Sequence, residues 1–515
     1  MPRVVSVALT NRKASLSLPG DLYDEFREFL KYRRPGWEYT TSGRVYVDWC
    51  SRVKKGEADP DEPMGWDGYI HLLEGRTVGA GIFLALKEKL ETEFDVRFVS
   101  KDERVSPQFS TPTREELPEK VRDYQWACLQ KMLAASKTGG LILNATGTGK
   151  TFSTGLYFKQ LKGNALFLVD ELTLLKQAIN ELRDVLQEDI GEIGNSVFRP
   201  RRITVATIQT IHRHRFDYSF VAWNKTLKAI VIDEVHLALN RRNFQTVAAI
   251  RPPVIFGLTA TLELKKKSVA YRAYDLCGPV VFEYPLVQGV EEGFLARGVA
   301  VSVELKQGVK GARIRGNPRW RWVRERYKQQ YQELYSEIIV EGKKRNEFIV
   351  AIVQEAYKRG KHIIVLLQRI NHITGLSKRL KGIPHRLVFG QVSVENRMLA
   401  QKHFEKEKVR VILTNVVFKK GINIKRIDVI VDGAAMKSKN DAVQKYGRGV
   451  RLCDGKDGLL YFDIADSGNR FEKAAISRRT ALVQTKIPTF KVSSELGARE
   501  ILRLAEKRLQ RILAG

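Results

Sequence analysis

The chain has 515 residues, of which 43% are hydrophobic and 28% are charged, and it carries a formal net charge of +30. This composition is typical of a globular protein with several domains of roughly 100–200 residues each, and no apolar run reaches the roughly 18 residues that a membrane span needs. So large a basic excess favours a polyanionic partner, nucleic acid above all, over a surface that is basic only for solubility.

The four cysteines are widely spaced, and the N-terminal run MPRVVSVALTNRK lacks the apolar segment of a secretory signal. The cysteine spacing fits neither a metal site nor a disulfide framework. We therefore expect a protein of a reducing cytoplasm, without a secretion signal and without membrane contact. The cysteines are Cys50, Cys128, Cys277 and Cys453.

Residues 1–100 alternate short apolar runs with amphipathic stretches. The runs at 4–10, 42–49 and 68–75 read as strands, and those at 21–32 and 81–94 read as helices. This pattern predicts a small α+β domain, which we expect to recognise nucleic acid. Its aromatic residues are expected in the core rather than stacked on bases: Trp37, Tyr39, Trp49, Trp66 and Tyr69. Residues 101–119 have the Pro, Ser and Thr content of a linker.

Two further blocks alternate β-branched strands with helical stretches. Residues 120–285 and 346–485 each show the pattern of a doubly wound parallel sheet. Between them, residues 286–345 read as a basic inter-domain bridge. Residues 486–515 have the leucine and isoleucine spacing of a C-terminal helix. The predicted fold class is therefore α/β, with two parallel-sheet domains in tandem after the small α+β domain.

A glycine-rich turn follows the first strand of the first block. The run Asn144-Ala-Thr-Gly-Thr-Gly-Lys-Thr151 lies between the apolar segment GGLIL and a predicted helix, which is the context of a Walker A loop. Its glycines allow backbone N–H groups to surround phosphates at the helix N-terminus. Lys150 is expected to reach the β- and γ-phosphates of ATP, and Thr151 to bind Mg²⁺. The predicted nucleotide-binding residues of the loop are Thr146, Gly147, Thr148, Gly149, Lys150 and Thr151.

Two carboxylates and an imidazole follow the strand AIVI in the run Asp233-Glu-Val-His236. A buried carboxylate needs a cation or water nearby, and ligands gather at the carboxyl ends of parallel strands. We therefore expect Asp233 to complete the Mg²⁺ shell and Glu234 to orient or deprotonate the attacking water. His236 is expected between the nucleotide and the next motif. The alternative is an ordinary helix N-cap.

In this order the motifs resemble those of superfamily 2 helicases over residues 120–485. VRDYQ (121–125) resembles the R-x-Y-Q element, which implies that Gln125 reads adenine with support from Arg122. The other matching runs are FLVDELTLLKQ (167–177), VATIQTI (205–211), GLTAT (257–261), IIVLLQRINH (363–372), ILTNVVFKKGINI (412–424) and QKYGRGVR (444–451), which resemble motifs Ia, Ib, III, IV, V and VI.

The resemblance implies two RecA-like P-loop domains with ATP and Mg²⁺ bound in the cleft between them. Arg448 and Arg451 would be arginine fingers, typically worth ~10³–10⁵ in rate, and Gln444 belongs to the same catalytic motif. Gly421 is expected at the nucleotide, and Asn423 stands where an aspartate is common.

The DEVH run and the short motif spacing resemble the XPB, RecG and UvsW branch of this superfamily. UvsW-type helicases fit best in size and through the N-terminal run GWDGYIHL (65–72). This implies an ATP-dependent DNA helicase or translocase that unwinds or branch-migrates forks, D-loops, R-loops or Holliday junctions in recombination, repair or replication.

Nucleic-acid contacts are expected in two places. In the motor, the backbone-contacting positions are Thr207, Gln209, Gln368, Arg369 and Thr414. Residues 306–328 carry nine Lys and Arg against one Glu, interleaved with Trp320 and Trp322, a composition that suits phosphate contacts and base stacking. The alternative for this segment is an exposed linker anchored by its tryptophans.

We expect a monomeric motor that acts on single-stranded and branched DNA, with recombination or single-strand-binding proteins as candidate partners. Three alternatives stay open: a helicase stimulated by RNA, the motor subunit of a restriction or defence complex, and a nucleic-acid-binding scaffold without ATPase activity. The presence of Lys150, Asp233, Glu234 and Arg451 argues against the last.

Overall fold

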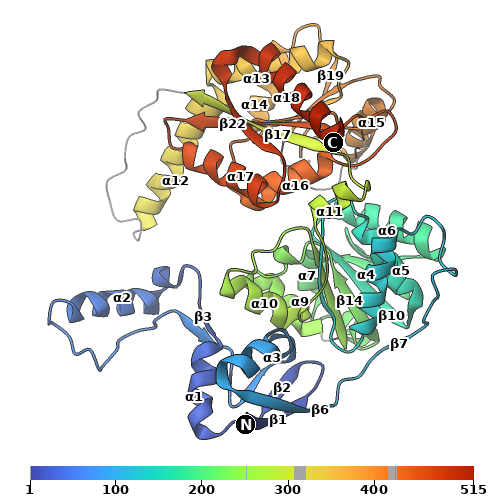
Figure 1. Ribbon diagram of the computed structural model, residues 1–515. Coiled ribbons are helices and arrows are strands. Elements are labelled where there is room, and N and C mark those ends of the chain that lie inside the picture. The colour runs from blue at the N-terminus through green and yellow to red at the C-terminus, as the bar shows by residue number, and fades with distance from the viewer. Residues whose placement is uncertain (1, 251, 307–320, 416–423, 425, 515) are drawn as a thin grey trace. The chain divides into compact units, whose positions relative to one another are not determined.

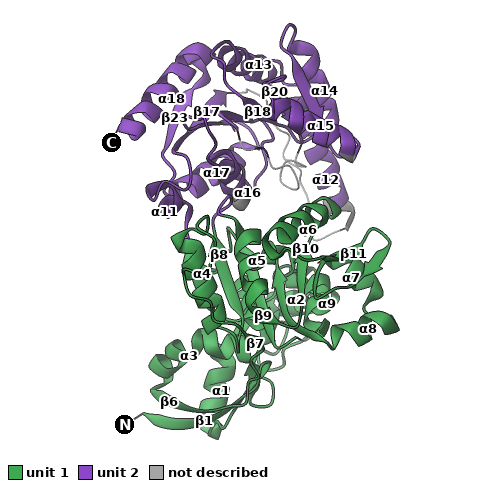
Figure 2. Ribbon diagram, turned by 90° about the vertical axis from the view of Figure 1, so that its right-hand side faces the viewer, with its two compact units in different colours: residues 1–144, 149–283 green, residues 145–148, 284–515 purple. Residues whose placement is uncertain are grey.

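The computed structural model describes residues 2–250, 252–306, 321–415, 424 and 426–514. Its contacts divide the chain into two compact units (Figure 2). Unit 1 comprises residues 1–144 and 149–283, and unit 2 comprises residues 145–148 and 284–515. Among the described residues, no helix is long and apolar enough to cross a membrane.

The N-terminal domain is a four-stranded sheet covered by two helices (Figure 1). Its strand order is β5 (Thr77–Gly79), β2 (Lys13–Leu16), β1 (Arg3–Leu9), β6 (Val96–Asp102), with β1 and β6 parallel. Alternate residues of β1 are buried against α1 (Gly20–Phe29) and α3 (Ala80–Phe94). The predicted α+β character of this domain is present.

A second layer of the N-terminal domain differs from the sequence prediction. Residues 42–49, predicted as a strand, lie in helix α2 (Thr41–Val53). The helix forms because the Thr40 side chain accepts a hydrogen bond from the Gly43 N–H at 3.0 Å, a helix-start signal that outweighs the β-branched alternation. The hairpin of β3 (Lys31–Arg33) and β4 (Tyr69–His71) adjoins this helix in the chain.

The five N-terminal aromatic residues predicted in the core are not buried; each is half-buried or exposed. They belong instead to a small surface cluster around α2 and the β3–β4 hairpin. The Trp37 and Tyr46 rings lie 5.8 Å apart, and the Trp66 indole N–H donates to the Tyr69 carbonyl at 2.9 Å. The core prediction was wrong because aliphatic side chains and phenylalanines already fill the space between the sheet and its helices.

The N-terminal domain packs closely on the first RecA-like block within unit 1. A Cβ added to Gly81 in α3 would lie 1.9 Å from the backbone carbonyl oxygen of Tyr274 in α10 (Lys267–Cys277), so the two helices meet with no side chain between them. The Asn11 amide donates to the carbonyls of Val105 and Lys137 at 2.9 and 3.0 Å. Within the predicted linker, β7 (Gln108–Phe109) pairs with β9 (Leu161–Lys162).

The main sheet of unit 1 has eight strands. Their order is β12 (Val197–Arg199), β11 (Gly191–Gly194), β13 (Ile203–Thr207), β10 (Asn164–Val169), β14 (Leu227–Ile232), β15 (Val254–Thr259), β8 (Gly140–Asn144) and β16 (Val280–Tyr284). The central pairs from β11 through β8 are parallel. One face packs against α4 (Asp123–Ala134), α5 (Lys150–Gln160) and α6 (Leu172–Leu186). The other packs against α7 (Ile208–His214), α8 (Tyr218–Asn224), α9 (Arg241–Ile250) and α10.

The sheet of unit 2 has seven strands, and its described pairs are all parallel. The order is β19 (His385–Val388), β20 (Val411–Thr414), β18 (Ile363–Leu366), β21 (Val429–Asp432), β22 (Leu459–Ser467), β17 (Gly298–Lys306) and β23 (Thr489–Ser493). Its first face packs against α13 (Lys343–Lys358), α14 (Ile370–Arg379) and α18 (Gly497–Ala514). Its second face packs against α15 (Val394–Glu405), α16 (Lys439–Gly449) and α17 (Glu472–Gln484).

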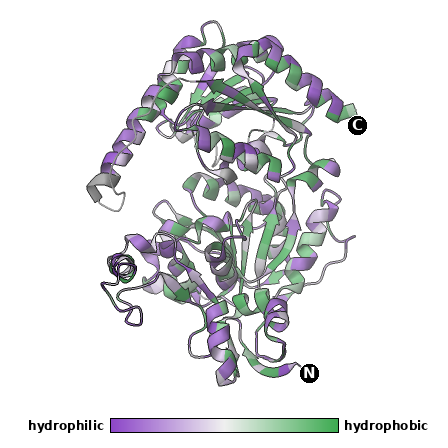
Figure 3. Cartoon of the chain, turned by 60° about the vertical axis from the view of Figure 1, so that its left-hand side comes forward, coloured by the Kyte–Doolittle hydropathy of each residue, from purple (hydrophilic) through white to green (hydrophobic). Residues whose placement is uncertain are grey.

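Strand β17 falls in the range predicted as a basic bridge, yet it lies inside the second sheet between β22 and β23. Helix α11 (Leu286–Glu291) precedes β17, and helix α12 (Arg321–Tyr335) follows the segment outside the described residues. Figure 3 shows the strands of both sheets as mostly hydrophobic and the outer helix faces as mostly hydrophilic. Fully apolar strands of this kind are typical of parallel sheets buried on both faces.

Candidate active site

The predicted phosphate-binding loop joins β8 to α5. Gly147 and Gly149 have φ angles of 92° and 75°, a conformation that residues with a side chain rarely adopt. The buried Thr148 hydroxyl donates to the Ala145 carbonyl at 2.8 Å, which closes the turn. Lys150 is the first residue of α5 and Thr151 the second, so both lie where the helix dipole attracts negative charge.

The DEVH run follows β14, two strands from β8 in the same sheet. The Asp233 N–H donates to the Leu168 carbonyl at 2.8 Å, and the Asp233 carboxylate accepts the Glu234 N–H at 3.0 Å. Glu234 itself has a φ of 47°. A non-glycine residue held in this left-handed conformation is uncommon and is found at functional sites more often than elsewhere.

Lys150 and Glu234 lie next to each other, as the sequence predicted for two residues of one site. The Lys150 ammonium is 3.6 Å from a Glu234 carboxylate oxygen, and the two side chains are 12% and 24% exposed. The structure therefore brings together the end of the glycine-rich loop and the carboxylate of the DEVH run within unit 1.

A threonine from the next strand completes this cluster. The Thr259 hydroxyl, at the end of β15, lies 3.2 Å from Glu234 Oε2 and 3.2 Å from His236 Nδ1. The His236 ring nitrogen is also 3.3 Å from the same carboxylate oxygen. Thr259 was not among the predicted site residues. The sequence did carry a signal for it, because GLTAT ends the strand beside β14, and parallel strands end at one edge of a sheet.

The predicted adenine-side residues lie at the start of α4. The Arg122 N–H donates to the Gln125 side-chain oxygen at 3.1 Å, and Gln125 is buried. A Cβ added to Gly149 would lie 3.0 Å from the Gln125 amide nitrogen. Gln125 therefore packs directly on the glycine-rich loop, which supports its expected place beside a bound nucleotide.

The donor set suits Mg²⁺. Thr151 and Asp233 offer a hydroxyl and a carboxylate oxygen, the hard ligands that Mg²⁺ prefers, and such sites usually use one or two protein ligands together with phosphates and water. Each is the neighbour in sequence of a residue in the Lys150–Glu234 pair. Among the described residues, no group of three or more His, Cys, Asp and Glu side chains forms a protein-only metal site.

In unit 2, Gln444 and Arg448 lie on α16, and Arg451 follows shortly after the helix ends. These three are partly exposed, whereas Ala442, Val443, Tyr446 and Val450 are buried. Residues three and four apart share one side of a helix, so the three predicted catalytic side chains lie along one side of α16 and its C-terminal extension.

Buried ion pairs hold this helix in place. The Lys445 ammonium lies 2.7 Å from Asp432 and 3.2 Å from Asp441, and the Tyr461 hydroxyl donates to Asp432 at 2.8 Å. Burial by itself raises the pKa of Asp432, but the charges of Lys445 and Arg478, together with the hydrogen bonds from Lys445 and Tyr461, outweigh burial and lower the pKa to about 2. The carboxylate therefore stays charged.

Lys456 supports the turn that carries Arg451. Its ammonium donates to the Arg451 carbonyl at 3.0 Å and also to the Gly449 carbonyl. Burial lowers the pKa of Lys456 to about 8. No sequence motif indicated Lys456, because its contacts form only when the loop after α16 folds back onto the end of that helix.

The predicted nucleic-acid contacts differ in accessibility. Thr207 and Thr414 are buried, and their hydroxyls serve local hydrogen bonds with the Thr210 and Asn415 backbones. Gln209 is exposed, and its side-chain amide donates to the Asp170 carboxylate at 2.9 Å. The Arg369 guanidinium lies 4.8 Å from the Tyr335 ring centroid. Gln368 is half-buried. Trp320 and Gly421 lie outside the described residues, and for Trp322 only the backbone, in α12, is described.

Comparisons with known proteins agree with this arrangement. Residues 119–264 match the family model described as "Type III restriction enzyme, res subunit", and residues 344–453 match "Helicase conserved C-terminal domain". The putative ATP-dependent helicase IRC3 of Saccharomyces cerevisiae is 25% identical over 67% of this chain and 51% of its own length. The chain thus spans about half the length of this relative. The ATP-dependent DNA helicase uvsW of enterobacteria phage T4 is 21% identical over 89% of each chain.

Among solved structures, S. cerevisiae Dbp5 bound to RNA and ADP BeF₃ has a TM-score of 0.53 at 14% identity, over 76% of this chain and 94% of that one. This similarity concerns the fold, and it confirms the predicted α/β class with tandem RecA-like domains. The two family matches follow each other along the chain in the order that the resemblance to superfamily 2 helicases implies, and the chain is similar across both to proteins described as ATP-dependent helicases.

Proposed function

We propose that this helicase uses ATP hydrolysis to unwind or branch-migrate branched DNA. The observation that carries the ATPase part is the approach of Lys150 to Glu234 at 3.6 Å. A lysine that binds phosphate and a carboxylate that positions water must both lie near the γ-phosphate, and here they are already adjacent.

Several residues of the first RecA-like block are proposed to contact the nucleotide, each with its own role. Lys150 and the N–H groups of residues 146–151 bind the β- and γ-phosphates, and Gln125 with Arg122 holds the adenine. Glu234 orients the attacking water and accepts its proton. The Thr259 hydroxyl and the His236 imidazole fix the rotamer of Glu234 through the contacts at 3.2 and 3.3 Å.

Thr151 and Asp233 would hold Mg²⁺, which supplies neutralising charge for the phosphate oxygens. Because Asp233 is fixed by two backbone hydrogen bonds, its carboxylate needs little reorganisation to take up that position. Preorganised groups of this kind favour catalysis.

Gln444, Arg448 and Arg451 are proposed to act on the same phosphates from the second RecA-like domain, with Arg448 and Arg451 as arginine fingers. A guanidinium that reaches the transferring phosphoryl group stabilises the charge of the transition state. Opening and closing of the two domains with the nucleotide state would then change their affinities for nucleic acid in alternation and drive stepping.

Two observations support a nucleic-acid substrate, and the first of them favours DNA. The match to the phage T4 DNA helicase spans 89% of both chains, whereas the match to IRC3 covers 67% of this chain. The net charge of +30 favours nucleic acid as a partner. We therefore propose that the N-terminal domain helps to recognise branched duplex.

An RNA-stimulated helicase is the second candidate, favoured by the structural similarity to an RNA-bound protein. ATPase and unwinding rates should be compared on forked DNA, four-way junctions and RNA–DNA hybrids of equal length, and ATPase rates also on single-stranded RNA. Faster turnover with forked or four-way DNA than with single-stranded RNA supports the proposal. Turnover that only RNA stimulates contradicts it.

A further inference from the structure

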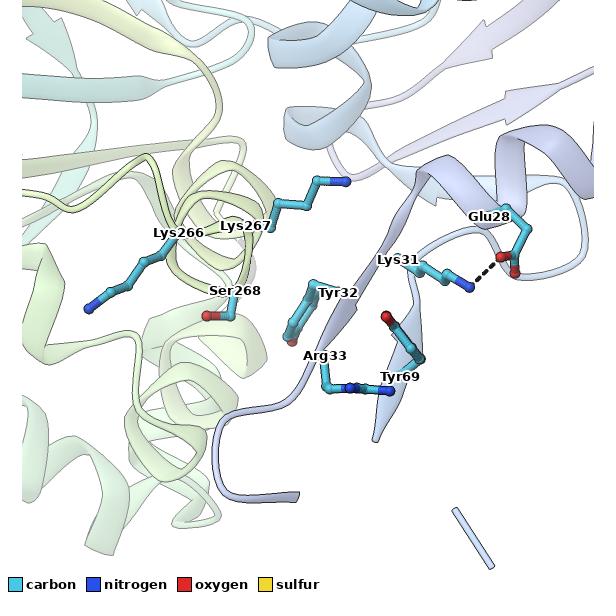
Figure 4. A pocket seen from close by; sticks show the side chains of 8 residues that line it. All are labelled: Glu28, Lys31, Tyr32, Arg33, Tyr69, Lys266, Lys267 and Ser268. Atoms are coloured by element: carbon cyan, nitrogen blue, oxygen red, sulfur yellow. Dashed lines mark hydrogen bonds and ion pairs between the residues drawn. The ribbon is translucent and has the colours of Figure 1, made fainter. Parts of the chain in front are cut away.

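A hollow of about 450 Å³ lies where the N-terminal domain meets helix α10 within unit 1 (Figure 4). The β3–β4 hairpin and the end of α1 form one wall, and the start of α10 forms the other. None of the helicase-like motifs within residues 120–485 contributes to it, and Tyr69 alone comes from the N-terminal run at 65–72. Its lining residues are Glu28, Lys31, Tyr32, Arg33, Tyr69, Lys266, Lys267 and Ser268.

Positive charge dominates this basic pocket, which has four cationic side chains and one carboxylate. The carboxylate, Glu28, is paired with Lys31, and the neighbouring Glu263 is paired with Lys266. Arg33 and Lys267 instead lie against aromatic rings. The Lys267 ammonium is 5.5 Å from the Phe29 ring centroid, and the Arg33 guanidinium is 4.6 Å from the Tyr69 ring centroid. The first turn of α10 adds the positive end of a helix dipole. The pocket is therefore suited to an anion.

The aromatic rings of this region are already covered by cations. The Arg33 guanidinium lies 4.6 Å from the Tyr69 centroid and 4.9 Å from the Trp37 centroid, and the Lys31 ammonium lies 4.4 Å from Tyr69. Stacking on an unpaired base needs a free ring face. These rings thus orient the cations and leave phosphate contacts as the main interaction that the pocket offers.

We propose that this basic pocket binds the phosphate backbone of a DNA duplex arm. A duplex presents phosphates on its outside and keeps its bases stacked inside, which matches a surface of oriented cations. Contacts of this kind position a duplex without reading its sequence. The inference rests on the proposed action on branched DNA and adds the place where a duplex arm of the branch is held.

Salt dependence tests the site. Each lost phosphate contact lowers the slope of log K against log salt by roughly 0.9 for duplex DNA. In the full chain, Lys266→Gln with Lys267→Gln should weaken binding of a blunt duplex by about tenfold and lower the slope by roughly two. The charge-preserving pair Lys266→Arg with Lys267→Arg should bind as the unmodified chain does.

The matched control removes two lysines elsewhere in the chain that each pair with a glutamate, as Lys266 does: Lys101→Gln and Lys358→Gln. It should leave the slope unchanged. Arg33→Gln provides a second variant from the other wall if the first fails to fold, as judged by its unfolding midpoint.

An unchanged slope in both pocket variants, or a loss equal to that of the control, overturns the proposal. A loss of affinity that is confined to single-stranded DNA also overturns the proposal. So does a pocket that binds inorganic phosphate or a free nucleotide at concentrations that leave duplex binding of the unmodified chain intact. DNA-stimulated ATPase of the unmodified chain is measured in parallel. Its absence would refute the proposed function, whereas its presence with an unchanged slope would refute only the pocket.

Discussion

Arg272 connects the N-terminal domain to the DEVH loop: its Nε donates to the Tyr32 hydroxyl at 3.2 Å. The same guanidinium donates to the Leu239 carbonyl at 3.0 Å. Tyr32 lines the basic pocket, and Leu239 lies three residues after His236. One side chain therefore touches both the proposed duplex site and the segment that carries the proposed water-orienting carboxylate.

Replacing Arg272 by Gln should reduce the coupling between duplex and hydrolysis. Both hydrogen bonds are lost, each of which contributes on the order of 1 kcal/mol. We expect duplex DNA to stimulate ATP turnover by a factor several times smaller than in the unmodified chain, measured as the ratio of rates with and without DNA. Arg241→Gln, on the exposed face of α9, is the control. Equal stimulation ratios in the two variants would show that Arg272 has no such part.

Lys150→Ala should abolish ATP turnover. The substitution removes the ammonium that is proposed to neutralise the β- and γ-phosphates, and no other lysine belongs to the loop at 144–151. DNA binding, followed by fluorescence anisotropy, should persist because the proposed nucleic-acid contacts lie elsewhere. Turnover that survives this substitution would contradict the assigned phosphate site.

Thr259→Val should lower kcat more than it raises KM for ATP. Valine keeps the shape of threonine but cannot hydrogen-bond to Glu234 Oε2 or to His236, which are both within 3.2 Å of the hydroxyl. An orienting hydrogen bond to a charged group is worth about 1.5–3 kcal/mol, so we expect kcat to fall by roughly tenfold or more. Thr246→Val, a buried threonine of α9 that hydrogen-bonds to the Arg242 carbonyl, is the control. A change confined to KM would argue for a role in binding instead.

His372 should make unit 2 sensitive to acid. The ring is buried, and Nε2 lies 2.8 Å from the Asn346 side-chain oxygen. Burial lowers the pKa of His372 to about 3, below the ordinary value of 6.5. The unfolded chain therefore binds a proton below pH 6.5 while the folded chain does not. Stability is fully present above pH 6.5 and is lost as the pH falls toward 3.

At pH 5 this loss amounts to about 2 kcal/mol, since one pKa unit corresponds to about 1.4 kcal/mol. The fall in denaturant midpoint between pH 7 and pH 5 should accordingly be smaller in His372→Gln than in the unmodified chain. His214→Gln, whose side chain is 45% exposed, is the control. The same fall in all three proteins would rule out His372 as the titrating group.

The most accurate predictions concerned segments whose local sequence pattern favours the same secondary structure that their packing in the fold requires. The apolar runs that precede the glycine turn and Asp233 were predicted as strands of one parallel sheet, and they form β8 and β14 of the main sheet of unit 1. The helix α2 was missed because its valines and aromatic residues alternate as in a strand, while the Thr40 cap that decides the outcome is a single residue. Strand β17 was hidden because the basic segment after it dominates the composition of residues 286–345.

Contacts between distant residues could not be predicted from local pattern. The DEVH resemblance indicated Glu234 and His236, but the threonine that joins them comes from a different strand. The basic pocket draws Lys31 and Lys267 from segments more than 200 residues apart. Neither segment carries a recognisable motif, because the charge of each becomes informative only when folding brings them together.

The glycine contact between α3 and α10 has a mechanical consequence. Backbone lies against backbone at Gly81 and Tyr274, so no long side chain is available there to act as a compliant spacer. A force on the N-terminal domain should therefore be transmitted along α10, which also carries Lys267 and Arg272. It should not be dissipated by a flexible contact between the two domains. The N-terminal domain and the first RecA-like lobe should therefore travel as one stiff arm through each cycle of ATP turnover.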